Sequence, residues 1–192
     1  MLNFPIKKQP TKNLNQKNIK KANLGMLLED MLNEANLYYL DKGLAVIHKK
    51  PTPVQIVKVN YPSRNEAVIT EAYYKTPSTT DYNGIYKGKY IDFEAKETNV
   101  TTSFSLNNVH PHQIKHLEDI TKHGGIGFFI IYFKKLDEVY LLPFEIIKEF
   151  WDKRNTDRKS IPYQVFLEKA YKIKISYMPM IDYLKVLDEV YF

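Results

Sequence analysis

Residues 79–97 read TTDYNGIYKGKYIDFEAKE, and the fold prediction starts from this stretch. Its second half alternates apolar and polar side chains with a period of two, which is the pattern of a β-strand. One face of this strand is expected to join the core, and the other to form a charged platform. The core face would carry Ile91, Phe93 and Ala95, and the platform Tyr90, Asp92, Glu94 and Lys96.

The first half of the stretch brings a second carboxylate to that platform. The segment between Asp81 and Glu94 is rich in glycine and tyrosine, so the chain can turn back and place the two acids side by side. Two such carboxylates can share one hard divalent cation of the magnesium type, which keeps positions free for water and phosphate oxygen. Lys96 leaves the same face as Glu94 and could stabilise charge on phosphorus. The pattern predicts metal-dependent phosphodiester hydrolysis; a solvated surface Glu-Lys pair is the alternative.

The rest of the chain favours an α/β fold with a mixed central sheet flanked by helices. Residues 125–133, GIGFFIIYF, form a continuous apolar run typical of a strand buried on both faces. The region from 161 onward reads as mixed helix and loop. The other expected elements are a helix over 24–40, a strand over 44–50, a helix over 107–122, a strand over 138–143 and a helix over 144–151.

Residues 51–78, PTPVQIVKVNYPSRNEAVITEAYYKTPS, contain two β-rich runs around a polar PSRN turn, with prolines at both bases. This pattern predicts a hairpin arm that leaves the body. Its basic side chains would then lie away from the core, where a long ligand could be held. An ordinary core meander is the alternative.

Positive charge is concentrated in two acid-free segments. Residues 1–22 form an expected flexible basic arm, whose six lysines account for the net charge of +6, and residues 23–192 are expected to form a single domain. A second acid-free segment spans 42–65. Both could follow a polyanion such as DNA, although a solvated, solubilising surface is the alternative. The candidate DNA-binding residues are Lys20, Lys21, Lys49, Lys50, Lys58 and Arg64.

Composition excludes several classes of function. The chain has no cysteine, so disulfides and thiolate zinc sites are excluded. No apolar run is long enough to span a membrane, and the N-terminal charges are not followed by the apolar core of a signal peptide. The protein is therefore expected in the cytoplasm, with no membrane partner.

Two further groups of side chains are candidates for a functional role. His110, His112, His116 and His123 crowd one helix and its lead-in, but they lack the glutamate of an HExxH zinc site, so contact with DNA phosphate or plain helix surface fits them better. Trp151 and the tyrosines could stack on bases, or could simply pack in the core and at its rim.

Several blocks of the sequence resemble the RecU family of bacterial Holliday junction resolvases, within the PD-(D/E)XK nuclease superfamily. The similarity covers roughly residues 23–184 in the same order. It rests on VIHKKPTPVQIV (46–57), TPSTTDYNG (76–84), YIDFEAKET (90–98), HQIKHL (112–117) and LDEVYLLP (136–143).

The resemblance implies a site residue by residue. The family's metal ligands fall on Thr79, Asp81, Glu94 and Gln113, and its residue that stabilises the transition state falls on Lys96. Glu29 matches an acid that nucleases of this superfamily aim at the metal. The chain departs from the family where an arginine is replaced by Leu24, which puts a DNA contact there in doubt, although Lys20 and Lys21 could substitute for it.

The resemblance also implies a restriction-endonuclease-like nuclease fold with a protruding β-hairpin stalk at about 51–78. The implied protein is a homodimer that resolves four-way DNA junctions by symmetric paired nicks, in homologous recombination and DNA repair. Mg²⁺ would be the cofactor, with Mn²⁺ as a substitute, and RecA and a branch-migration helicase would be partners. The alternatives are a restriction-type or other structure-specific endonuclease, and a non-catalytic junction-binding protein that modulates recombinases.

Overall fold

The computed structural model describes residues 28–63, 66–75 and 78–192. The predicted basic arm at 1–22, the start of the predicted first helix and Arg64 therefore lie outside the described residues. The elements in chain order are α2 (Leu28–Asp41), β1 (Ala45–Lys49), β2 (Val54–Asn60), β3 (Val68–Tyr74), β4 (Tyr82–Tyr86), β5 (Lys89–Thr98), β6 (Ser103–Ser105), η1 (Leu106–Asn108), α3 (Pro111–Lys122), β7 (Ile126–Phe133), β8 (Glu138–Pro143), α4 (Phe144–Lys153), β9 (Ser160–Pro162), α5 (Tyr163–Lys169), β10 (Tyr171–Ile173) and α6 (Tyr183–Tyr191).

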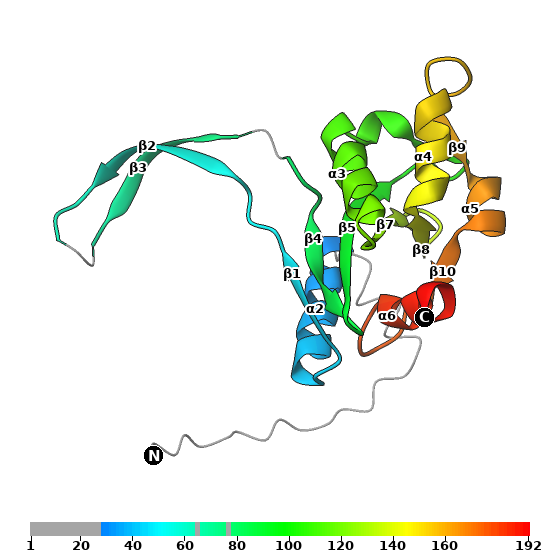
Figure 1. Ribbon diagram of the computed structural model, residues 1–192, viewed down its shortest axis with the longest axis horizontal. Coiled ribbons are helices and arrows are strands. Elements are labelled where there is room, and N and C mark those ends of the chain that lie inside the picture. The colour runs from blue at the N-terminus through cyan, green and yellow to red at the C-terminus, as the bar shows by residue number, and fades with distance from the viewer. Residues whose placement is uncertain (1–27, 64–65, 76–77) are drawn as a thin grey trace.

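A six-stranded sheet with the order β1-β4-β5-β7-β8-β10 forms the centre of the protein (Figure 1). Strands β5 and β7 run parallel and the other neighbours run antiparallel, so the sheet is mixed. Every residue of β7 is buried, which confirms the prediction for 125–133. The strand β10 was not predicted, because three residues are too few to show a period in the sequence.

Helices cover both faces of this sheet. One core cluster joins α2 and α6 to the sheet, and the other joins α3, α4 and α5 to the opposite face. Figure 1 shows α2 and α3 on opposite sides of β4 and β5. The expected α/β fold, a mixed sheet flanked by helices, is confirmed. None of the helices in the described residues is long and apolar enough to cross a membrane.

The β4–β5 hairpin sets the position of the two acids. Lys87 and Gly88 both have positive φ angles, 46° and 74°, which gives the tight two-residue turn of a twisted hairpin. The pairing of Tyr82 with Phe93 continues the register to Asp81 opposite Glu94. The segment read as a glycine- and tyrosine-rich loop is therefore mostly strand, and it does return Asp81 to Glu94.

Strand β1 runs along β4 and delivers the chain to the same end of the sheet. Its last residue, Lys49, pairs with Tyr82. Gly84 permits this close approach, because a Cβ atom there would lie 2.1 Å from the carbonyl oxygen of Val46. The chain therefore leaves the sheet beside Asp81 before it enters the next hairpin.

Strands β2 and β3 form a separate two-stranded sheet, which we call the stalk. Nearly all of their residues are exposed, and Figure 1 shows the stalk extending away from the body. This arrangement confirms the predicted protruding hairpin and rejects the core meander. Lys58 lies exposed on the stalk.

The predicted charged face of β5 is present, but its acids are not open to solvent. Asp92 is 0% exposed and Glu94 is 1% exposed. The reason is that β5 is an interior strand and α3 lies over this face of it. The carboxylates consequently depend on protein partners.

Candidate active site

A cavity of about 620 Å³ opens where β1, β4, β5 and the start of α3 meet. The chain has two legs at the stalk: an outgoing leg between β1 and β2, and a returning leg just before β4. Both legs form one wall of the cavity. The cavity brings together eight residues selected from the sequence: Glu29, Lys49, Lys50, Thr79, Asp81, Glu94, Lys96 and Gln113.

The two predicted acids and the lysine meet inside this cavity. Lys96 Nζ lies 2.7 Å from Glu94 Oε1. Asp81 is held on the other side, where its Oδ2 accepts a hydrogen bond of 3.1 Å from the Ala95 main-chain N–H. Because that N–H belongs to the residue between Glu94 and Lys96, the Asp81 carboxylate is fixed to the strand that carries both.

Glu94 is in an environment that disfavours its charged form. Burial, followed by the negative charge of Asp81, raises the pKa of Glu94 to about 8, and the positive charge of Lys96 opposes this increase. Its Oε2 atom is buried and accepts no hydrogen bond from the described residues. A carboxylate with a free buried oxygen beside a second carboxylate would be stabilised by a bound cation.

Gln113 occupies the first turn of α3 and closes the cavity. Its Nε2 donates to Glu94 Oε1 over 2.5 Å, and its Oε1 accepts from the His110 main-chain N–H over 2.8 Å. The second bond belongs to the capping box that begins the helix. The amide oxygen of Gln113 accepts this one bond, and its second lone pair leaves it able to serve as a metal ligand.

The remaining predicted residues lie around the rim or outside the site. Glu29 on α2 forms an ion pair with Lys49, and both side chains are partly exposed at the cavity. Thr79 lines the cavity, and its hydroxyl donates weakly to the Thr80 carbonyl, at 3.4 Å. Lys58 is on the stalk, away from this set. Lys20, Lys21, Leu24 and Arg64 are outside the described residues.

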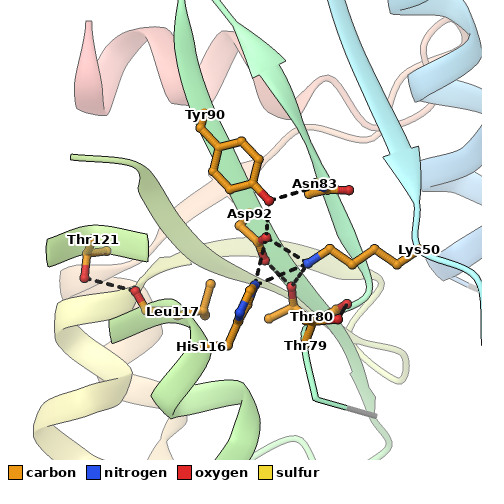
Figure 2. A network of polar contacts seen from close by, with 9 residues as sticks. All are labelled: Lys50, Thr79, Thr80, Asn83, Tyr90, Asp92, His116, Leu117 and Thr121. Carbon is orange, nitrogen blue, oxygen red and sulfur yellow. Dashed lines mark hydrogen bonds and ion pairs between the residues drawn. The ribbon is translucent and has the colours of Figure 1, made fainter. Parts of the chain in front are cut away.

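Sequence reasoning missed a buried polar network next to the acids (Figure 2). Its centre is Asp92, which binds Lys50, Thr80, Tyr90 and His116. Lys50 was predicted to contact DNA, but its ammonium group is turned toward Asp92. Strand alternation in the sequence could have indicated Asp92, because it lies two residues before Glu94 and therefore on the same face of β5.

The zinc alternative for the histidines finds no geometric support. Within residues 28–63, 66–75 and 78–192, no group of three or more histidine and carboxylate side chains is arranged to hold a metal ion. The rings of His110 and His112 are stacked with centroids 5.5 Å apart, while His116 turns to Asp92. Burial, followed by the nearby His110, lowers the pKa of His112.

Trp151 packs in the core rather than presenting a face for a base. It is 8% exposed in the cluster beneath α3 and α4, and the Arg154 guanidinium lies 3.8 Å from the centre of its ring. The packing interpretation of Trp151 is therefore the one the structure supports.

Comparison with known proteins links this chain to one family over most of its length. The family model described as RecU, Recombination protein U, matches residues 23–189. A protein of Geobacillus kaustophilus (strain HTA426) named Holliday junction resolvase RecU is 56% identical over 172 residues, which cover 89% of this chain and 86% of that protein. A protein of Bacillus thuringiensis (strain Al Hakam) with the same name gives the same identity and coverage.

A solved structure of Hjc, described as a Holliday junction resolvase of Archaeoglobus fulgidus, aligns with a TM-score of 0.38 and 11% identity, covering 70% of this chain and 82% of that one. The family of this chain is established by the family model and the sequence relatives, and not by the Hjc alignment. The RecU family model spans the chain from α2 into α6, including the stalk and every described residue of the cavity. On this evidence, the chain belongs to the RecU family.

Proposed function

We propose that this protein is a metal-dependent endonuclease that resolves four-way DNA junctions by paired symmetric nicks, in homologous recombination and DNA repair. The observation that carries the proposal is the placement of Asp81, Glu94 and Lys96 in one cavity at the foot of the stalk. The named activity of relatives that are 56% identical supports the same substrate. We take residues 23–192 as a single nuclease domain of the restriction-endonuclease-like type.

The donor set fits a hard divalent cation. Asp81 and Glu94 supply neighbouring carboxylates, and the buried Oε2 of Glu94 lacks a partner among the described residues. We propose Mg²⁺, with Mn²⁺ as a substitute, held by Asp81, Glu94, Thr79 and Gln113, since these ions prefer oxygen ligands. When bound, the ion would polarise a phosphate oxygen and lower the pKa of a coordinated water.

The protein's own groups divide the remaining tasks. Asp81 and Glu94 would hold the ion beside the reacting phosphate. The ammonium group of Lys96, 2.7 Å from Glu94, is placed to stabilise negative charge that develops on the phosphate. Glu29 and Lys49 at the rim would help to position the DNA backbone.

Symmetric nicks require two equivalent sites, so the working form is proposed to be a homodimer with two-fold symmetry. The stalk gives each subunit a second contact at a distance from its cavity, which suits a branched ligand more than a linear duplex. This feature argues against a restriction-type enzyme. The partnership with RecA and a branch-migration helicase, and the cytoplasmic location, remain proposals that rest on the family.

The test uses a four-way junction whose branch point cannot migrate and a linear duplex of matched length. Cleavage of each is measured with and without Mg²⁺. Paired nicks in the junction alone, dependent on the metal, are expected. Asp81→Asn should abolish the nicks and retain junction binding in a gel-shift assay. Equal cleavage of the duplex would indicate a restriction-type enzyme, and junction binding without cleavage by the natural chain would indicate a non-catalytic modulator.

A further inference from the structure

Asp92 is a fully buried carboxylate with an unusually complete set of partners (Figure 2). Its Oδ2 accepts hydrogen bonds from Lys50 Nζ at 2.8 Å, from the Tyr90 hydroxyl at 2.9 Å and from His116 Nε2 at 3.0 Å. Its Oδ1 accepts from the Thr80 hydroxyl. Because burial of an unpaired charge is costly, these bonds hold the surrounding segments against one another.

Both the side chain and the main chain of Lys50 form hydrogen bonds. Its N–H donates to the Asp81 carbonyl oxygen over 2.7 Å. Its Nζ donates to Thr80 Oγ1 over 3.0 Å as well as to Asp92. The side chain is only 17% exposed. The lysine therefore holds the residue that precedes Asp81 and Asp81 itself.

The residues of this network come from separate segments of the chain. Lys50 is on the leg that leaves β1 for the stalk, and Thr80 is on the leg that returns from it. Asp92 is in β5, on the same face as Glu94. His116 is in α3, one turn after Gln113. The network thus touches every segment that supplies a proposed metal ligand, and it joins both legs of the stalk.

We propose that Lys50, Thr80 and Asp92 form a clamp at the root of the stalk, and that this clamp holds Asp81 in register with Glu94. They are positioning residues, which act on the proposed cleavage through the ligand segment and not by touching DNA. The inference rests on the proposed nuclease function, because its effect is read as a cleavage rate. A misplacement of about 1 Å in such a site typically lowers a rate on the order of 10²-fold.

The competing role for Lys50 is a direct contact with DNA phosphate, and the two roles differ in what they change. Loss of a phosphate contact weakens binding and reduces the slope of log affinity against log salt by about 0.9. Loss of the clamp leaves affinity and salt slope unchanged but slows cleavage when DNA is saturating. Lys58 provides a matched control, since it is an exposed lysine on the stalk and does not line the cavity.

The experiment uses the full chain with Lys50→Met or Lys58→Met. Junction affinity is measured over a salt series in EDTA, and single-turnover cleavage is measured at saturating junction in Mg²⁺. Lys50→Met should lose about 10²-fold in rate with an unchanged salt slope, whereas Lys58→Met should lower junction affinity and reduce the salt slope. A lower salt slope with a normal rate for Lys50→Met would overturn the clamp.

Thr80→Val and Thr80→Ser supply a second test that does not remove a buried charge. Valine keeps the shape and loses the hydroxyl that Asp92 Oδ1 accepts from, so it should reduce the cleavage rate and lower the melting temperature, while junction affinity stays near that of the natural chain. Serine keeps the hydroxyl and should restore the rate. Equal rates for both variants would contradict the proposal. If the natural chain cleaves no junction at all, the proposed function fails first, and that result is distinct from either of these.

Discussion

Glu94 Oε1 receives two donors, Lys96 Nζ at 2.7 Å and Gln113 Nε2 at 2.5 Å, while its Oε2 accepts from none of the described residues. One oxygen of this carboxylate is therefore fixed by the protein, and the other is buried without a donor from the described residues. The lysine lowers the cost of charging Glu94 and the neighbouring Asp81 raises it. Metal affinity should depend on this balance, because a ligand carboxylate must lose its proton before it binds.

Lys96→Met is the first variant that tests this balance. Without the ammonium group, the pKa of Glu94 should rise further above about 8, so that fewer molecules carry the charged ligand at neutral pH. The half-saturating Mg²⁺ concentration for cleavage should increase. At saturating Mg²⁺ the rate should still be about 10²–10³ lower, because a donor to the developing charge is missing.

A Mg²⁺ titration of single-turnover cleavage, repeated at pH 7 and pH 9, measures both effects. The shift in half-saturation should shrink at the higher pH as Glu94 ionises. Lys122→Met, which removes an exposed helix-surface pair with Glu118, is the control and should match the natural chain. An unchanged half-saturation in Lys96→Met would show that the lysine does not govern the charge of Glu94.

The stability of the metal-free protein should fall as the pH rises through the range of Glu94. Its pKa is raised from 4.5 to about 8 in the folded state, so between these values the folded state binds more protons than the unfolded state. The stabilising contribution is complete below about pH 4.5 and is lost by about pH 8. The loss from this group is on the order of a few kcal/mol.

Urea unfolding in EDTA at a series of pH values checks this slope. Glu94→Gln should flatten the decline and should be more stable than the natural chain at pH 8. Glu138 is a useful contrast: burial opposes ionisation, but hydrogen bonds from Lys172, Tyr163 and Tyr140 outweigh it and lower the pKa of Glu138. Glu138→Gln should therefore change only the acidic side of the profile. A decline that persists in Glu94→Gln would assign the slope to other groups.

The stalk should be removable without unfolding the body. Strands β2 and β3 pair only with each other in the described sheets, and the Lys75 N–H donates to the Pro53 carbonyl at their base over 3.0 Å. Replacing residues 54–74 by a short turn should leave the melting temperature nearly unchanged. The preference for a four-way junction over a duplex should be largely lost, since the distant contact is gone.

Competition binding between the junction and a duplex of equal length measures this preference directly. A variant with Lys58→Ala in an otherwise intact stalk is the control, and it should weaken binding without removing the preference. If the truncated protein still selects the junction, recognition of the branch belongs to the body of the protein and not to the stalk.

The sequence carried enough information for the acids, since strand alternation put Glu94 and Lys96 on one face and the glycine-rich turn allowed Asp81 to return. It also separated the stalk from the sheet, because prolines at both bases are poorly compatible with interior strands. It could not show that α3 would cover the same face of β5. Alternation marks Asp92 as polar, but only the packed helix makes it buried, and burial is what makes Lys50 a partner of Asp92.

Residues 1–21 carry six lysines and no acid and so account for the formal net charge of the whole chain. If these lysines contact phosphate, deleting the segment should weaken binding to junction and duplex alike. Each lost contact should reduce the slope of log affinity against log salt by about 0.9. Cleavage at saturating junction should stay near that of the full chain, because Asp81, Glu94 and Lys96 are untouched. An unchanged salt slope would reduce the segment to a solubilising tail, and loss of cleavage at saturation would mean that it completes the active site or the dimer.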